Sequence, residues 1–82
     1  MSRLILYTTA GCHLCEQAEA VLAPLLTRHG LSLERVDIAL SDVLMAQYGV
    51  YIPVLKWADS ESVLYWPFDQ AVAEQYLQRR IS

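Results

Sequence analysis

The stretch Arg3-Leu4-Ile5-Leu6-Tyr7-Thr8-Thr9-Ala10-Gly11-Cys12-His13-Leu14-Cys15 contains a strand, a short loop and the start of a helix. Residues 3–8 form a near-continuous apolar run with aromatic and β-branched members, which is typical of a strand covered on both faces. Residues 9–11 read as a loop. A helix is expected over residues 12–29, because apolar side chains recur there at helical spacing and Gly30 supplies a C-terminal cap. Two cysteines therefore lie in the first turn of a helix, directly after a buried strand.

The next segment completes a β-α-β unit. Residues 31–38 alternate between apolar and polar side chains over much of their length, which predicts a second strand. A strand, a helix and a strand in this order imply two parallel strands joined by a right-handed crossover. The two cysteines are then expected where the carboxyl end of the first strand meets the helix. Asp37, near the end of the second strand, is expected to be a solvated acid.

The second half of the chain predicts a short helix, a hairpin and a last helix. Ser41 suits the N-cap of the short helix and Gly49 its end. Residues 51–58 and 62–66 are expected to be strands joined by a polar turn. The predicted fold is therefore α/β, with the element order β-α-β-α-β-β-α and a four-stranded mixed sheet flanked by helices.

The two longer helices are each expected to bury one face. The last helix is expected to run from an N-cap at Asp69 to about Arg80. The predicted inner face of this helix is Val72, Tyr76 and Leu77. The predicted inner stripe of the first helix is Cys15, Ala18, Leu22, Leu25 and Leu26.

Length and composition limit the class of protein. The 82 residues, 55% hydrophobic and 18% charged, predict one globular domain spanning residues 1–82, with any site a shallow surface feature. The six Lys and Arg residues are scattered and the formal net charge is −3, so nucleic acid is not an expected partner. The apolar runs are far shorter than the ~20 residues that span a bilayer, and no signal peptide is recognised. The expectation is a cytoplasmic monomer that contacts neither nucleic acid nor membrane.

The pair Cys12 and Cys15 carries the chemistry that this sequence predicts. A C-x-x-C pair beside a β-α-β pattern is a signature of thiol–disulfide redox proteins. Amides at a helix N-terminus lack intrahelical partners and carry partial positive charge, so a thiolate at Cys12 would be stabilised and its pKa lowered. Cys15 lies one turn later and is expected to be the more buried of the two. His13 would add positive charge near Cys12 and make the couple more oxidising.

Two other features of the sequence admit more than one interpretation. Pro53 is expected to open a strand, where its missing amide does no harm. A second hypothesis makes the Ile52-Pro53 peptide cis and places it beside the dithiol, so that a backbone edge pairs with substrate. Structural zinc usually requires a second ligand pair at matched spacing, and this chain has none, so no metal site is expected.

The opening motif resembles that of a known family. The stretch Leu6-Tyr7-Thr8-Thr9-Ala10-Gly11-Cys12-His13-Leu14-Cys15-Glu16-Gln17-Ala18 is similar to the opening of short bacterial glutaredoxin-like proteins, and essentially the whole chain resembles a glutaredoxin of the thioredoxin fold. The resemblance implies that Cys12 is the nucleophile, that Cys15 is the resolving cysteine and that the peptide before Pro53 is cis. It also implies a sheet in which the strands lie in the order second, first, third, fourth.

The chain departs from typical glutaredoxins at three places. His13-Leu14 replaces Pro-Tyr between the cysteines, and Trp66-Pro67-Phe68-Asp69 stands where a Gly-Gly and an Asp bind glutathione. No Lys or Arg lies between Arg3 and Arg28, where most family members carry a Lys before the first cysteine. These departures argue against glutathione as a ligand, and no tightly bound cofactor is expected. The candidate substrate-binding residues are His13, Leu14, Ile52, Pro53 and Asp69.

The functional hypothesis is a thiol–disulfide oxidoreductase that forms a reversible disulfide between Cys12 and Cys15. Its substrate would be a protein or small-molecule disulfide, and its reductant either glutathione or a thioredoxin reductase system. The alternative is a non-catalytic thioredoxin-fold binding module or an iron–sulfur cluster-binding protein. The intact C-x-x-C favours the first hypothesis, while the missing Gly-Gly keeps the second open.

Overall fold

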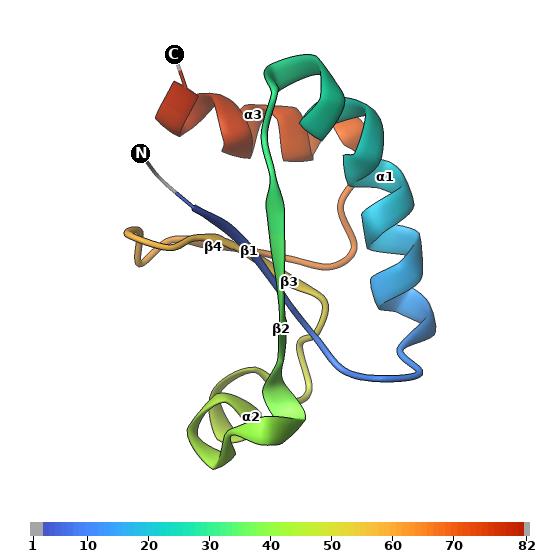
Figure 1. Cartoon of the computed structure of the whole chain (residues 1–82), viewed down its shortest axis with the longest axis vertical. Coiled ribbons are helices and arrows are strands. Elements are labelled where there is room, and N and C mark those ends of the chain that lie inside the picture. The colour runs from blue at the N-terminus through green and yellow to red at the C-terminus, as the bar shows by residue number, and fades with distance from the viewer. Residues whose placement is uncertain (1–2, 82) are drawn as a thin grey trace.

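The structure is a computed structural model that describes residues 3–81 (Figure 1). The elements follow the predicted order, with one additional 3-10 helix, η1, after the second strand. Their bounds are β1 (Leu4–Thr8), α1 (His13–His29), β2 (Leu33–Asp37), η1 (Ile38–Leu40), α2 (Asp42–Tyr48), β3 (Val54–Trp57), β4 (Val63–Tyr65) and α3 (Gln70–Ile81).

The four strands form one mixed sheet in the order β2-β1-β3-β4, as the resemblance implies. β1 and β2 are parallel, whereas β1 pairs with β3, and β3 with β4, in antiparallel fashion. Thr8 at the end of β1 is opposite Asp37 at the end of β2. Tyr7 is opposite Val54, the first residue of β3. The carboxyl ends of β1 and β2 and the start of β3 therefore meet at one end of the sheet.

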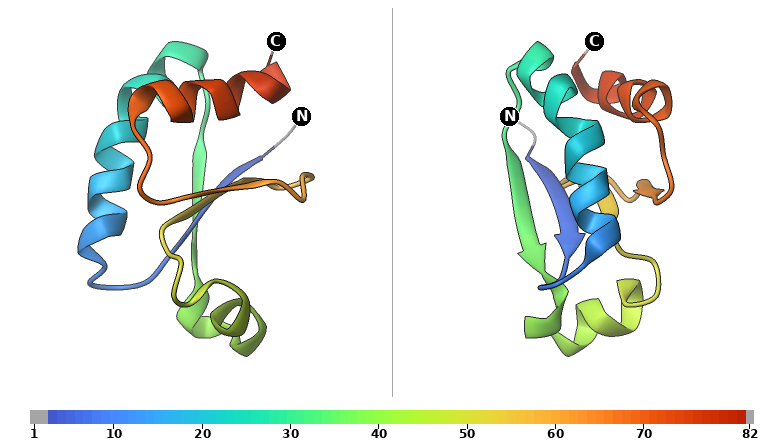
Figure 2. Two further views of the ribbon diagram at one scale, coloured as in Figure 1. Left: turned by 180° about the vertical axis from the view of Figure 1, so that it is seen from behind. Right: turned by 90° about the vertical axis from the view of Figure 1, so that its right-hand side faces the viewer.

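The sheet is covered on both faces, as the apolar run of β1 predicts. Alternate residues of a strand point to opposite faces. Leu4 and Leu6 belong to a buried cluster with residues of α1 and α3, while Ile5 and Tyr7 belong to a second cluster with Ile38 and Tyr48. Figure 2 shows α1 and α3 on one side of the strands, with α2 at the end of the sheet away from α3.

The helix ends follow the predicted capping residues. Gly30 adopts a left-handed conformation with φ of 63°, and its amide donates to the carbonyls of Leu26 and Thr27. The Ser41 hydroxyl accepts from the Leu44 amide at 3.2 Å, and the Asp69 carboxylate accepts from the Val72 amide at 2.9 Å. These bonds satisfy amides and carbonyls that a helix terminus otherwise leaves unpaired.

Two sequence predictions of this part of the fold are wrong in detail. Val72 is 42% exposed, and Ala73 is buried in its place with Tyr76 and Leu77, at the i, i+3, i+4 spacing of one helix face. The third strand begins at Val54, not at residue 51. The amides of residues 51 and 52 donate to the carbonyl of Tyr48, so they are used by the turn that ends α2 and not by the sheet.

Among residues 3–81, none of the helices combines the length and the hydropathy that a membrane span requires.

A cluster of ionisable side chains joins the C-terminal end of α1 to α3. Nε2 of His29 lies 2.5 and 2.9 Å from the two carboxylate oxygens of Glu74, and Nη1 of Arg28 lies 3.0 Å from one of them. The side chains of His29 and Glu74 are only 20% and 18% exposed. The hydrogen bond from His29 is the main cause that lowers the pKa of Glu74 below its ordinary value of 4.5.

Replacing a core leucine should destabilise the fold far more than replacing an exposed one. Leu22 is fully buried between α1 and the sheet, so Leu22→Ala should lower the unfolding free energy by about 2–5 kcal/mol. Leu40 is 87% exposed, and Leu40→Ala should change it by no more than about 0.5 kcal/mol. Urea unfolding of both variants measures the difference, and equal losses would contradict the described core.

The contribution of Glu74 to stability should depend on pH. A carboxyl whose pKa is lowered by folding stabilises the native state above its unfolded pKa, and this stabilisation is lost as pH falls through the folded pKa. Glu74→Gln should therefore lower the melting temperature at pH 7, and the difference from wild type should shrink below about pH 4.5. Glu61→Gln, an exposed change in the turn between β3 and β4, is the control. A Glu74→Gln effect that is the same at pH 7 and pH 3 would refute this interpretation.

Candidate functional site

Cys12 occupies the N-cap position of α1, one residue before the helical bounds. Its backbone is extended, with φ of −80° and ψ of 106°, and its sulfur accepts a hydrogen bond from the Cys15 amide at 3.1 Å. The preceding Gly11 has a positive φ of 74°, so this residue reverses the chain between β1 and α1. A sulfur at this position is the hydrogen-bond acceptor that the free amides of the helix start require.

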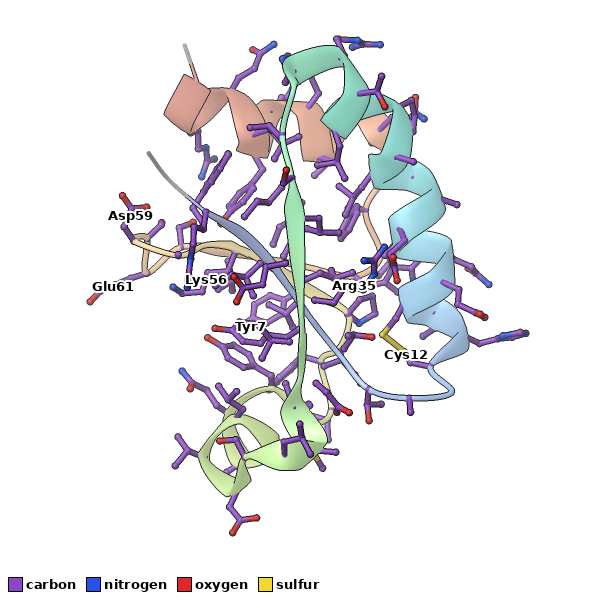
Figure 3. The ribbon with its side chains drawn as sticks, in the orientation of Figure 1. Tyr7, Cys12, Arg35, Lys56, Asp59 and Glu61 are labelled. Atoms are coloured by element: carbon purple, nitrogen blue, oxygen red, sulfur yellow. A yellow bond between two sulfur atoms is a disulfide. The ribbon has the colours of Figure 1, made fainter. Side chains whose placement is uncertain are left out.

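The structure joins Cys12 and Cys15 in a disulfide (Figure 3). Their Cα atoms lie 5.2 Å apart, in the usual range for bridged cysteines. Cys12 is half-buried, whereas Cys15 is 2% exposed and faces the core. Of the two sulfurs, that of Cys12 is therefore the one that a molecule from solvent reaches.

A cavity of about 300 Å³ lies beside the disulfide, on the β2 side of β1. It is bordered by both cysteines, the loop after β1, one side of α1 and the end of β2. Figure 3 shows Arg35 extending from β2 toward α1, on the same side of the molecule as Cys12. The lining residues are Thr8, Thr9, Ala10, Gly11, Cys12, Cys15, Glu16, Glu19, Arg35 and Asp37.

The wall of this cavity is charged. Nε and Nη2 of Arg35 both contact Oε1 of Glu19, and this hydrogen bonding, followed by the carboxylate charge, raises the pKa of Arg35. Asp37 is half-buried, and its Oδ1 accepts from the Ala39 amide at 2.9 Å, which caps η1. The sequence did not predict Glu19 or Arg35 at the site, and Asp37, which was expected to be a solvated acid, is instead half-buried in the cavity wall. The signal for Asp37 was present, because parallel strands in a β-α-β unit end side by side at the start of the helix.

His13 and Leu14 are exposed on the first turn of α1. Nδ1 of His13 lies 3.2 Å from Oε2 of Glu16, so its ring contacts a carboxylate. Leu14 is 46% exposed. Neither residue lines the cavity, and both project from the part of α1 that flanks the Cys12 sulfur.

Ile52, Pro53 and Asp69 lie on the other side of β1, toward β3 and β4. The Ile52-Pro53 peptide is cis, as the resemblance implies, and Pro53 is buried just before Val54, which pairs with Tyr7. The carbonyl of Pro53 accepts from the Trp66 amide at 3.3 Å, three residues before Asp69 caps α3. Ile52 and Pro53 therefore lie at the same sheet end as the disulfide, on the side of β1 opposite to the cavity, whereas Asp69 lies at the start of α3.

Trp66 and Phe68 pack against each other and against the core. Their rings meet edge to face at a centroid distance of 5.0 Å, and Phe68 is 6% exposed. The Trp66-Pro67 peptide is also cis. In residues 3–81 no group of three His, Cys, Asp or Glu side chains is arranged to hold a metal ion.

Comparison with known proteins finds one family and several solved structures. The sequence profile of the family described as Glutaredoxin-like domain (DUF836) matches residues 3–78. Protein XcR50 from X. campestris is 33% identical, with a TM-score of 0.79 over 93% of this chain and 96% of that chain. Protein Ne2328 from Nitrosomonas europaea is 30% identical, with a TM-score of 0.77 over 92% and 89% of the two chains.

Thioredoxin O2 from Arabidopsis thaliana, in its oxidized state, is 16% identical, with a TM-score of 0.74 over 100% of this chain and 76% of that chain. At this identity the likeness supports the fold alone, and it is a thioredoxin-like fold. Comparison with curated protein sequences finds no match.

The two thiols should differ in reactivity once the disulfide is reduced. Cys12 is half-buried at the helix start and Cys15 is buried, so iodoacetamide should modify Cys12 at least about tenfold faster at pH 7. Single-cysteine variants, Cys12→Ser and Cys15→Ser, followed by mass spectrometry, give the two rates separately. In guanidinium the rates should converge. A faster reaction at Cys15 in the folded protein would contradict the described burial.

Proposed function

This chain belongs to the glutaredoxin-like domain family, and we propose that it is a thiol–disulfide oxidoreductase with Cys12 as nucleophile and Cys15 as resolving cysteine. One observation carries the proposal. The Cys12 sulfur lies at the start of α1, accepts the Cys15 amide and is bonded to the buried Cys15 sulfur. An accessible sulfur held by helix amides, with a second sulfur within bonding reach, is what two-step disulfide exchange requires.

In the first step the reduced protein attacks a substrate disulfide. The amide hydrogen bond and the positive end of α1 favour the thiolate of Cys12 over its thiol. This thiolate attacks one substrate sulfur, so a Cys12–substrate disulfide forms as the substrate S–S bond breaks. The other half of the substrate leaves as a thiolate and takes a proton from solvent.

In the second step Cys15 resolves the mixed disulfide. Cys15 loses its proton to solvent, its thiolate attacks the Cys12 sulfur, and the second half of the substrate leaves as a thiolate that takes up a proton. The protein has then given up two electrons and holds the Cys12–Cys15 disulfide, and the substrate has become two thiols. Because Cys15 is buried, its thiolate does not reach substrate disulfides directly, so Cys12 reacts first and Cys15 second.

The proposed substrate is a protein or small-molecule disulfide, and regeneration needs a dithiol reductant such as a thioredoxin reductase system, or glutathione. The chain lacks the Gly-Gly before Asp69, and its first turn carries His13-Leu14. Of the candidate residues, His13 and Leu14 flank the Cys12 sulfur along α1. Ile52 and Pro53 present the cis peptide at the same sheet end, and Asp69 lies beyond Trp66, which pairs with Pro53. These residues are proposed to contact the substrate backbone.

Removal of either cysteine should stop the reaction at a different step. With bis(2-hydroxyethyl) disulfide, Cys15→Ser should accumulate a mixed disulfide of one mercaptoethanol per chain on Cys12, because no second sulfur can release it. Cys12→Ser should form adducts at least about a hundredfold more slowly than Cys15→Ser, because the remaining sulfur is buried. Intact mass after acid quenching measures both.

The wild-type protein under the same conditions should yield only the intramolecular disulfide and free mercaptoethanol. A non-catalytic binding module would instead leave the wild-type thiols unchanged while partner binding survives Cys12→Ser. Failure of Cys15→Ser to form any adduct would contradict the proposed nucleophile.

A further inference from the structure

The cavity beside the disulfide does not contain any of the residues that the sequence singled out for substrate binding. It lies where the carboxyl ends of the parallel strands β1 and β2 meet the start of α1, the position at which open α/β sheets commonly bind ligands. Both cysteines form part of its wall. A chemical group that occupies it is therefore adjacent to the sulfurs that exchange.

The size of the cavity suits one side chain or one half of a small disulfide. Its volume of about 300 Å³ is at the lower end of the range for small-molecule sites. When the reacting sulfur of a substrate contacts Cys12, the substrate atoms beside that sulfur would enter the cavity. The residues that line the cavity would therefore determine which chemical groups beside the reacting sulfur make a disulfide a good substrate.

The charges of the lining do not cancel. Glu16, Glu19 and Asp37 supply three carboxylates, and Arg35 supplies the one guanidinium. Arg35 is engaged by Glu19, so that pair is neutral as a unit. Glu16 contacts the His13 ring, which neutralises it only when the imidazole is protonated.

Asp37 is the carboxylate without a counter-charge. Within residues 3–81 it takes part in no ion pair, and its hydrogen bond goes to the neutral Ala39 amide. It is half-buried at the end of β2, opposite Thr8. Partial burial beside a low-dielectric wall strengthens its attraction for a cation that enters the cavity.

We propose that Asp37 is a specificity-determining residue of the redox site, which selects disulfides that carry a positive charge next to the reacting sulfur. In a protein substrate this is a cysteine flanked by Lys or Arg. Anionic disulfides, glutathione disulfide among them, are disfavoured by the same charge. The inference rests on the proposed thiol–disulfide exchange and names the class of substrate for it; the bonds formed and broken are those of the two steps above.

The test compares three small disulfides with the reduced wild-type chain: cystamine, which is cationic, bis(2-hydroxyethyl) disulfide, which is neutral, and 3,3′-dithiodipropionate, which is anionic. Formation of the Cys12–Cys15 disulfide is followed by acid quench, alkylation and mass. Each rate constant is divided by that of dithiothreitol with the same disulfide, which removes the intrinsic reactivity of the substrate. The ratio of cationic to anionic rates also removes any change in the reactivity of Cys12 itself.

For the wild-type protein, the ratio of cationic to anionic rates should be about 10 at low salt. It should fall toward 1 in 0.5 M NaCl, because salt screens the attraction between Asp37 and the cationic disulfide. Asp37→Asn should lower the low-salt ratio by about threefold or more, the size expected for the loss of one nearby charge at a protein surface. The Asn side-chain oxygen can still accept the Ala39 amide, and circular dichroism checks the fold. Glu61→Gln, exposed in the hairpin turn, should leave the ratio unchanged.

Two results would overturn the proposal while the proposed function stands: a wild-type ratio near unity at low salt, or an Asp37→Asn ratio equal to that of wild type. The salt series on the wild-type protein decides the first without any variant. If the neutral disulfide also fails to oxidise the wild-type chain, the proposed function fails and the specificity inference with it.

Discussion

The hydrogen bond from the Cys15 amide to the Cys12 sulfur is the contact on which the site depends. It exists because β1 ends at Thr8, Gly11 reverses the chain, and α1 then begins with Cys12 at its N-cap. The helix start needs an acceptor for its free amides, and the sulfur provides it. The same bond orients Cys12 over the first turn, where the Cys15 sulfur lies within bonding distance.

The rest of the fold holds this turn in place. β1 is an inner strand, between β2 and β3, and its alternate residues are buried on opposite faces of the sheet. Packing on both faces therefore fixes the end of β1, from which the loop to α1 begins. α1 is anchored by a stripe that begins with Cys15 itself and continues through Ala18, Leu22 and Leu25. Cys15, the proposed resolving cysteine, is thus also a core residue, and its burial leaves the Cys12 sulfur as the more accessible of the two.

Much of this arrangement could be predicted from the sequence, because short-range signals and long-range pairing agree. The C-x-x-C turn after an apolar strand, the cap at Gly30 and the strand order all follow from local chemistry together with the family resemblance. The exact start of a strand could not be predicted where a turn and the sheet compete for the same backbone amides. Residues 51 and 52 favour a strand by type, but their amides are taken by the Tyr48 carbonyl, which delays β3 to Val54.

Apart from the first turn of α1, the sequence predicted site residues only on the side of β1 that faces β3 and β4. The sequence motif drew attention to Pro53 and Asp69, toward β3 and β4, whereas the charged cavity is formed on the β2 side by Glu19, Arg35 and Asp37. Their approach to the cysteines depends on strand register, in which Asp37 lies opposite Thr8, and on the ion pair between α1 and β2. Neither a periodic pattern nor a cysteine motif reports such contacts between distant residues.

The most direct test of the central claim is the thiol state of the purified chain across glutathione redox buffers, trapped by alkylation and measured by mass. The account predicts one two-electron transition to a Cys12–Cys15 disulfide, with a midpoint between about −270 and −120 mV, the span of known dithiol oxidoreductases. Two free thiols throughout the series, or a glutathione adduct that persists on Cys12, would contradict it.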